Sequence, residues 1–420
     1  MKRLIRLLAV GMAVVAPGSP AEATQWQGTV MDSAGVTIVA NSERGVWAER
    51  EGWTVVEELK IGSFDDPDYQ FGKIASLAVG SHGAIYVLDA QAQRIQVYDA
   101  MGDYQRTIGG PGAGPGELAE ATEFIAMGAG DTLLVPDRFN ARINLYDASG
   151  ESIGSVRMAS GYGTITWRGT RFGVVARQIR PAWQGTPDSM DVIELLNMAG
   201  SVRDTLMRFA SGGTFAMGGA RPEMTILAAE PIWTIDDERT AYYGINDDYR
   251  ISKYSGGKLT HIISKTFEKR EISESDQSML RDAIMDAAID AAGKGRAPLS
   301  ALEPLRQMIR FRETYPAFAQ LEVGPGGTLW VQHLRDFTNL TSAERANIKV
   351  NLFNLQRGRV NSFEDAGAQT WDVFDVEGRF LGVVTMPDRF APRLFVGNQV
   401  YGVWRDDLDV EYVMRARIDP

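Results

Sequence analysis

Four polar residues stand where apolar, strand-like runs of the sequence end, and they are the first candidates for chemistry. Asp89 follows IYVL, Asp137 follows LLVP, Asn246 follows YYGI and His333 follows LWVQ. Carboxylate and amide oxygens with one imidazole are ligands that a divalent cation such as Ca²⁺ accepts. If these strand ends meet, we expect a ligand-binding site there, with Asp89, Asp137 and His333 as candidate cation ligands and no other cofactor.

A structural role for the two aspartates is the competing interpretation. Arg94 stands five positions after Asp89, and Arg142 stands five positions after Asp137. This spacing suits an ion pair across a hairpin loop, which would recur simply because the sequence pattern recurs. His333 breaks the pattern, so the structural explanation fits it less well.

Aromatic side chains offer a second kind of site. Trp183 lies in the stretch RQIRPAWQGTPDSM, where an exposed indole could stack on a sugar or a peptide. Most other tryptophans fall within strand-like runs, where bulky side chains are expected to fill the core. Trp183 is therefore the candidate aromatic contact for a ligand.

Other catalytic chemistries lack the residues that they need. The chain has no cysteine, which excludes disulfides and thiol catalysis. Its histidines are His82, His261 and His333; His82 precedes a strand-like run and His333 ends one, so a three-histidine zinc site is not expected. No GxSxG nucleophile motif occurs, and hydrolysis by a nucleophilic serine is unsupported.

The elements that must position these residues come from a repeat. The segment GAIYVLDAQAQRIQVYDAMGDYQRTIG (83–109) aligns without a gap with DTLLVPDRFNARINLYDASGESIGSV (131–156), through the Asp-x-x-Gly turn of each. Looser copies bring the total to six. The turn positions lie 48, 50 and 58 residues apart, at Tyr98, Tyr146, Leu196 and Tyr254. This period is typical of four-stranded blades, so we expect an all-β, six-bladed β-propeller whose equivalent strand ends share one mouth.

Two stretches of sequence carry a family resemblance. The string IGGPGAGPGEL and the pattern G-x-IYVLD-x-x-x-x-RIQVYD-x-x-G resemble the NHL repeat. With TYPAFAQLEVGPGGTLWVQ (314–332), they resemble more closely a group of bacterial exported six-bladed β-propellers. The resemblance covers nearly all of the chain after residue 23, and the first two copies match the motif best. It implies a fold, whereas the functions of such proteins are diverse.

The glycine-rich stretch GGPGAGPGEL (109–118) raises the question of phosphate binding. A loop of the GxxxxGK[ST] kind needs a lysine and a hydroxyl residue after its last glycine, and here Glu117 and Leu118 follow. Because the stretch connects the outer strand of one expected blade with the inner strand of the next, we interpret it as a corner. A backbone nest that also contacts an anion is the alternative.

Strand-like runs before the first copy are expected to close the ring. GVTIVAN and WTVVEELKIG precede it, and the chain stops shortly after the run YVMRARI. A propeller built from a linear chain leaves an unpaired strand unless its two ends share a blade. We therefore expect the N-terminal segment to supply an outer strand to the sixth blade.

Two insertions interrupt the repeat. Residues 273–315 predict two helices, the first with a capping box at Ser273 and Asp276 and a partly apolar face. That face comprises Met279, Ile284, Ala287 and Ile289. The helices are expected to pack on the propeller, with a lid or a partner surface as the alternative. Residues 335–369 are polar and are expected to form a long loop over one face.

The N-terminus and the net charge bear on location and partners. Residues 1–23 combine three basic residues, a short apolar run and the pattern Ala-Glu-Ala, which is typical of a signal peptide cut after Ala23. We expect residues 24–420 to form one exported domain, periplasmic or extracellular, without a membrane span and monomeric. Loss of the leader changes the formal charge from −11 to −13, which disfavours nucleic acid as a partner.

Two functional hypotheses follow from the sequence. The leading one is a non-enzymatic module that binds a protein, peptide or glycan through its mouth, with Asp89, Asp137, Asn246, His333 and Trp183 at or near the site. The alternative is a metal-dependent hydrolase or lyase, similar in general layout to propeller lactonases. The sequence leaves open whether the chain is an enzyme.

Overall fold

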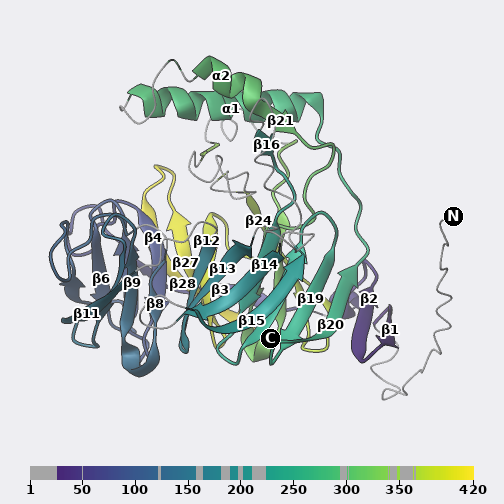
Figure 1. Ribbon diagram of the computed structural model, residues 1–420, viewed down its shortest axis with the longest axis horizontal. Coiled ribbons are helices and arrows are strands. Elements are labelled where there is room, and N and C mark those ends of the chain that lie inside the picture. Colours follow the sequence, from purple (N-terminus) through teal and green to yellow (C-terminus); the bar gives the residue numbers. More distant parts are fainter. Residues whose placement is uncertain are drawn as a thin grey trace.

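Six sheets, each built on four antiparallel strands, form the main body of the protein in the computed structural model, and one of them is extended to six strands (Figure 1). The structure describes residues 26–49, 51–121, 124–157, 164–180, 190–196, 202–210, 224–293, 300, 302–338, 340, 348–350, 363 and 366–420. The predicted signal peptide and Trp183 lie outside these residues. Each sheet is one blade, and the six blades confirm the predicted architecture.

Blades 1 to 3 follow one another along the chain, each with its strands in sequence order. Blade 1 comprises β4 (Ile74–Val79), β5 (Ile85–Asp89), β6 (Arg94–Tyr98) and β7 (Tyr104–Ile108). Blade 2 comprises β8 (Ala126–Met127), β9 (Leu133–Asp137), β10 (Arg142–Tyr146) and β11 (Ser152–Arg157). Blade 3 comprises β12 (Thr164–Thr170), β13 (Gly173–Arg180), β14 (Met190–Leu196) and β15 (Val202–Ala210).

Blades 4 to 6 complete the ring. Blade 4 comprises β17 (Pro231–Ile235), β18 (Thr240–Ile245), β19 (Arg250–Ser255) and β20 (Lys258–Lys265). Blade 5 comprises β22 (Gln320–Val323), β23 (Leu329–Leu334), β24 (Gly367–Phe374) and β25 (Phe380–Thr385). Blade 6 comprises β26 (Phe390–Val396), β27 (Gln399–Arg405), β28 (Glu411–Asp419) and, from the N-terminal segment, β3 (Thr54–Ile61).

The two ends of the chain share blade 6, as the sequence predicts. Strand β3 pairs antiparallel with the last strand, β28, from Thr54 opposite Asp419 to Ile61 opposite Val413. An edge strand with unpaired backbone groups would otherwise remain at the outside of this blade. The pairing therefore converts a linear series of sheets into a closed ring.

The earlier strand-like run has a different place from the one expected. Strands β1 (Gly28–Ser33) and β2 (Val36–Asn41) form a hairpin, and β2 pairs in parallel with β20, which extends blade 4 to six strands. Asn41 fixes this hairpin because its side chain donates to the carbonyl of Gly378 at 2.9 Å and accepts the amide of Phe380 at 2.8 Å. The N-terminal segment thus reinforces blades 4 and 5 before it closes blade 6.

One apolar cluster lies at each junction between neighbouring blades. Between blades 5 and 6 the buried side chains include Trp330, Trp371 and Phe390. Equivalent clusters join blades 1 and 2, 2 and 3, 3 and 4, 4 and 5, and 6 and 1. Since a fully buried large apolar side chain contributes about 1.5–3 kcal/mol, these junctions hold the ring together by packing.

Because neighbouring strands run in opposite directions, alternate connections lie on the same face of the ring. We call one of these two faces the mouth face, and it carries two kinds of connection. They are the connections from the second to the third strand of each blade and from an outer strand to the next blade. The glycine-rich stretch between β7 and β8 is one of them, and it is a corner. Gly109 and Gly116 adopt φ of 77° and 74°, and the amide of Gly114 donates at 2.7 Å to the carboxylate of Glu117.

The described parts of both insertions lie on the mouth face, where they form a layer beside the blades together with a short strand from the connection between blades 3 and 4; we call this layer the roof. It contains α1 (Glu274–Gly293), α2 (Leu302–Met308) and the parallel pair β16 (Met224–Ile226) with β21 (Ile309–Phe311). Figure 1 shows α1 and α2 above the blades. No helix in the described ranges is both long enough and apolar enough to cross a membrane.

Helix α1 begins with the predicted capping box but buries a different face. Asp276 accepts the amide of Ser273, and Ser273 Oγ accepts the amide of Asp276, both at 3.1 Å. The buried residues of this helix recur mainly at every fourth position and are Asp276, Leu280, Ile284, Ala288 and Ala291. Ile289, expected on the apolar face, is exposed because that face turns one residue away from the sequence prediction.

Candidate functional site

Asp89 lies buried at the mouth end of β5, where its carboxylate accepts backbone amides. Its carboxylate accepts the amides of Gly72 and Lys73, from the connection that enters blade 1, at 3.0 and 3.1 Å. It also accepts the amides of Gln91 and Ala92 in its own hairpin loop, at 3.0 and 3.1 Å. The side chain therefore satisfies four backbone donors at the start of the blade.

Asp137 has the same role in blade 2, where its carboxylate accepts backbone amides. It accepts the amides of Ala119 and Glu120, both at 3.0 Å, and the side-chain amide of Asn140 at 2.7 Å. The similarity of the two sites comes from the repeat, because each connection between blades brings backbone N–H groups to the same strand end.

The expected ion pairs of these aspartates are not formed. Arg94 pairs with Asp89 in strand register, but its guanidinium donates to the carbonyl of Gln70 at 3.2 Å. Arg142 donates to the carbonyl of Glu117 at 3.0 Å. At each strand end, the carboxylate therefore accepts backbone N–H groups of the connection that enters the blade, and the guanidinium donates to a backbone carbonyl of the same connection. The two side chains do not pair with each other.

Asn246 holds the equivalent position in blade 4. Its side chain accepts the amide of Glu230 at 2.7 Å and donates to the carbonyl of Phe318 at 2.9 Å. Because an amide both accepts and donates, Asn246 joins the connection entering blade 4 to the one entering blade 5. It is fully buried, so it does not face a ligand at the mouth.

His333 is the exception among the four. Its Nε2 lies 2.8 Å from Oδ1 of Asp372, and its Nδ1 lies 3.1 Å from Oγ1 of Thr370. The other carboxylate oxygen of Asp372 accepts the hydroxyl of Tyr249 at 2.5 Å and the ammonium of Lys265 at 2.7 Å. These side chains form a charged cluster at the junction of blades 4 and 5, from which both helical and loop insertions begin.

Burial and charge act in opposite directions within this cluster. Burial raises the pKa of Asp372, but the contacts with His333 and Lys265 lower it by more, so its pKa lies below the ordinary value. Burial and the neighbouring carboxylate raise the pKa of Tyr249 well above the ordinary value. The tyrosine therefore stays protonated and donates its hydrogen bond to a charged carboxylate.

The sequence prediction missed Asp372, although the repeat contained a signal for it. In the aligned copies RIQVYD, RINLYD and TWDVFD, the third residue is Gln96, Asn144 or Asp372. Gln96 donates to the carbonyl of Asp68 at 2.8 Å, and Asn144 donates to the carbonyl of Glu117 at 3.3 Å. A polar residue at this position therefore contacts the segment that precedes its blade. In blade 5 the contact is with Lys265, at the end of the preceding blade.

The three candidate cation ligands belong to separate networks. Asp89, Asp137 and His333 each bind partners at a different blade junction. Across the described ranges, no three histidine, aspartate or glutamate side chains lie close enough together to hold a metal ion. The residues described here therefore supply no cation site of the kind that the sequence suggested.

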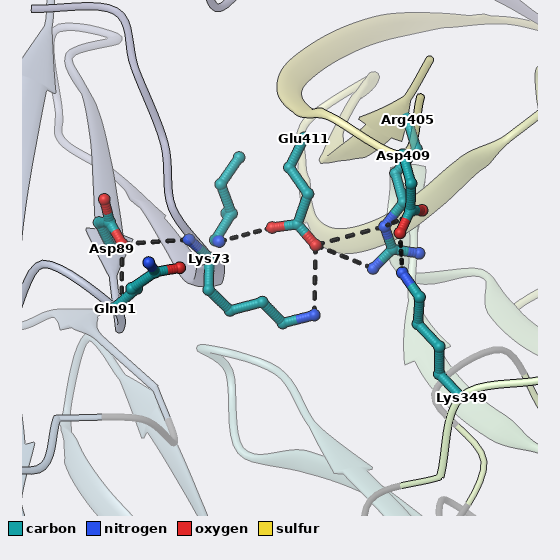
Figure 2. Close-up of polar contacts among 8 residues, drawn as sticks. Lys73, Asp89, Gln91, Lys349, Arg405, Asp409 and Glu411 are labelled. Carbon is teal, nitrogen blue, oxygen red and sulfur yellow. Dashed lines mark hydrogen bonds and ion pairs between the residues drawn. The ribbon is translucent and has the colours of Figure 1, made fainter. Parts of the chain in front are cut away.

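A second charged cluster lies at the junction of blades 6 and 1 (Figure 2). Arg405 takes the strand-end position in blade 6 and contacts Glu411 at 3.0 Å. Glu411 also accepts the amide of Ile74 at 2.6 Å and contacts the ammonium of Lys73 at 3.2 Å. The last strand of the chain is thus bound to the first blade by a nearly buried carboxylate.

The same row of charges continues to the roof. Asp409, in the loop between β27 and β28, lies 3.7 Å from Arg405 and pairs with Lys349 of the insertion that leaves blade 5 (Figure 2). Alternating charges therefore run from blade 1 through blade 6 to the roof on the mouth face.

Exposed apolar side chains accompany these charges at the tips of mouth-face connections. Phe64, between blades 6 and 1, is 74% exposed; Phe139, in the loop between β9 and β10, is 76% exposed; Leu408, beside Asp409, is 84% exposed. Apolar side chains this exposed bury little surface within the chain, so they contribute little to its stability.

Comparison with known proteins supports the architecture. The family model DUF5128, described as a 6-bladed beta-propeller, matches residues 67–160, which include blades 1 and 2. The chain is a six-bladed β-propeller. No curated protein is significantly similar to it in sequence. The resemblance to NHL repeats remains a prediction.

Solved structures of similar shape have little sequence in common with the chain. A Bacteroides fragilis protein described as exported is 12% identical, with a TM-score of 0.49, over 91% of this chain and 100% of that one. An inactive virginiamycin B lyase from Staphylococcus aureus, solved with quinupristin, is 9% identical, with a TM-score of 0.38, over 87% and 99%. A gluconolactonase from Xanthomonas campestris is 11% identical, with a TM-score of 0.37, over 88% and 98%. At this level, similarity carries no information on activity.

Proposed function

We propose that this protein is an exported binding module that recognises a protein or peptide through the open part of its mouth face, over blades 6, 1 and 2. The observation that carries the proposal is the placement of Phe64, Phe139 and Leu408 at the tips of connections on that face. Exposed aromatic and aliphatic anchors surrounded by charged groups are typical of protein interfaces.

The polar strand ends support binding rather than catalysis as the main role. Asp89, Asp137 and Asn246 are buried and occupied by backbone groups. Their geometry explains why these positions are polar without any substrate. The alternative, a metal-dependent hydrolase or lyase, gains no specific support from the contacts among the described residues.

Export is part of the proposal and rests on the leader-like pattern of residues 1–23. The chain recovered from cells should begin at Thr24, which intact-mass measurement checks. A chain that keeps residues 1–23 would contradict export by this route.

Paired substitutions test the proposed recognition face. The probe is the exported-protein fraction of the cells that make the chain, cross-linked to the purified mature domain, and affinity is then measured for each captured protein. Phe139→Ser with Leu408→Ser should weaken that affinity at least roughly tenfold, since each lost anchor costs about 1 kcal/mol or more.

Met101 supplies the matched control. It is also 76% exposed, but it lies in the turn between β6 and β7, on the opposite face. Met101→Ser should leave the affinity unchanged. Equal losses in both variants, or a loss only with Met101→Ser, would overturn the assignment of the mouth face.

A further inference from the structure

The roof has an apolar core of its own. Leu280 and Ile284 of α1 pack with Ile226 of β16, Ile309 of β21 and Phe337 of the second insertion. This cluster is distinct from the six clusters between blades. Elements that share one core move together more readily than they deform, so the roof forms a single packed body.

This body joins the propeller at blades 4 and 5. At blade 4, β16 leads within a few residues into β17, and Ala317 donates to the carbonyl of Asn246 at 2.7 Å. At blade 5, the same apolar cluster includes Ala319 just before β22, Leu334 at the end of β23 and Ala366 just before β24. Backbone hydrogen bonds continue across this attachment: Ala319 donates to Gln332 at 2.9 Å, and Arg335 donates to Ala366 at 2.8 Å. The attachment at blade 5 is therefore buried and hydrogen-bonded.

The contacts of the roof with blades 4 and 6 include exposed ion pairs. Arg312, just after β21, contacts Asp247 in the mouth-face loop of blade 4 at 2.5 Å, with side chains 34% and 48% exposed. Lys349 pairs with Asp409 of blade 6, with side chains 38% and 53% exposed. Exposed pairs are weak and are screened by salt.

The pair at blade 6 can break without leaving a carboxylate isolated. Asp409 also lies 3.7 Å from Arg405, which is itself bound to Glu411. When Lys349 moves into water, Asp409 keeps a cationic neighbour. The closed and open arrangements therefore differ by little more than one solvent-exposed contact at this edge.

We propose that the roof is a lid hinged at blades 4 and 5, and that the pair Lys349–Asp409 holds its edge at blade 6 closed over the mouth face, while Arg312–Asp247 lies beside the hinge. The inference rests on the proposed function, because opening would change access to the face on which recognition is placed. Salt, or a partner whose charged groups compete for Asp409 and Lys349, would open it.

The absence of cysteine allows a clean test on the full mature chain. Spin labels are attached at Ser278→Cys on the exposed side of α1 and at Ala113→Cys in the corner between blades 1 and 2. Pulsed electron resonance then gives the distance distribution while salt rises from about 0.01 M to about 1 M, across which the screening length falls from about 30 Å to about 3 Å. We expect a second, longer distance that grows with salt.

Charge substitutions identify the contact responsible. Lys349→Glu should produce the longer distance even at low salt, and the charge swap Lys349→Glu with Asp409→Lys should remove it again. Lys269→Glu is the control, because Lys269 is exposed and forms no ion pair within the described ranges. Melting curves of the labelled variants check that each is folded.

A single distance that is unchanged by salt and by Lys349→Glu would overturn the lid. An equal response to Lys269→Glu would also overturn it, because the effect would then come from net charge. The measurement reports the roof alone, so its failure leaves the proposed recognition face standing. Conversely, failure of the Phe139 and Leu408 test would leave the lid intact.

Discussion

At the scale of the residue, Asp372 shows how one repeat position changes its chemistry with its surroundings. In blades 1 and 2 the position carries a neutral amide that donates one hydrogen bond to a carbonyl. In blade 5 it carries a carboxylate with no exposed surface, in contact with Lys265, Tyr249 and His333. A buried carboxylate is tolerated only when its charge is compensated.

Replacing this carboxylate should be costly. Asp372→Asn leaves the ammonium of Lys265, which is 11% exposed, without its counter-charge. Removal of one partner of a buried pair costs about 3–5 kcal/mol. Asp388→Asn, at a 92% exposed carboxylate, is the control and should change the free energy of unfolding by less than about 0.5 kcal/mol. Urea denaturation at neutral pH compares the two, and equal small effects would contradict the assigned role.

Acid should reduce the contribution of Asp372 to the free energy of unfolding. Because the pKa of Asp372 is lower in the folded protein than in the unfolded chain, its stabilising effect is present above the unfolded value of about 3.9. The effect is lost as the pH falls through the lower folded value. The stability difference between wild type and Asp372→Asn should therefore shrink below about pH 4. A difference that grows on acidification would contradict the assigned direction of the shift.

At the scale of the element, the N-terminal strands divide into two structural roles. The β1–β2 hairpin adds to the outside of blade 4, whereas β3 completes blade 6. The hairpin extends a blade that already has four strands from its own repeat. Strand β3 replaces a strand that the last repeat lacks, so its loss opens the ring.

Two truncations separate these roles. A mature chain that begins at Ser42 lacks the hairpin and should remain folded, with a lower melting temperature. A chain that begins at Phe64 also lacks β3, so the edge of β28 is exposed and monomeric folded protein should be largely lost. Size-exclusion chromatography and thermal melting compare them. Similar stability of the two chains would contradict closure by β3.

Local patterns in the sequence predicted those elements whose partners also repeat. The strands of blades 1 and 2, the closure by β3 and the capping box of α1 are confirmed. The place of β2 could not be predicted, since its parallel pairing with β20 joins residues more than two hundred positions apart. The partners of Asp89 and Asp137 could not be predicted because the connections between blades determine them.

At the scale of the whole molecule, the ring sorts structural and recognition roles onto different parts. Packing between blades and buried polar side chains at strand ends hold the ring. The insertions and the exposed apolar side chains at loop tips lie on the mouth face. Equivalent connections of all six blades share this face because the chain runs through every blade in the same direction. Recognition residues can therefore vary there without disturbing the cores between blades.

Hydrogen–deuterium exchange of the chain with and without a captured partner tests recognition by the mouth face most directly. We predict slower exchange in the connections at 62–73, 138–141 and 406–410 when the partner is bound. The opposite-face turns at 99–103 and 375–379 should exchange at unchanged rates. Protection confined to those opposite-face turns would contradict recognition through the mouth face.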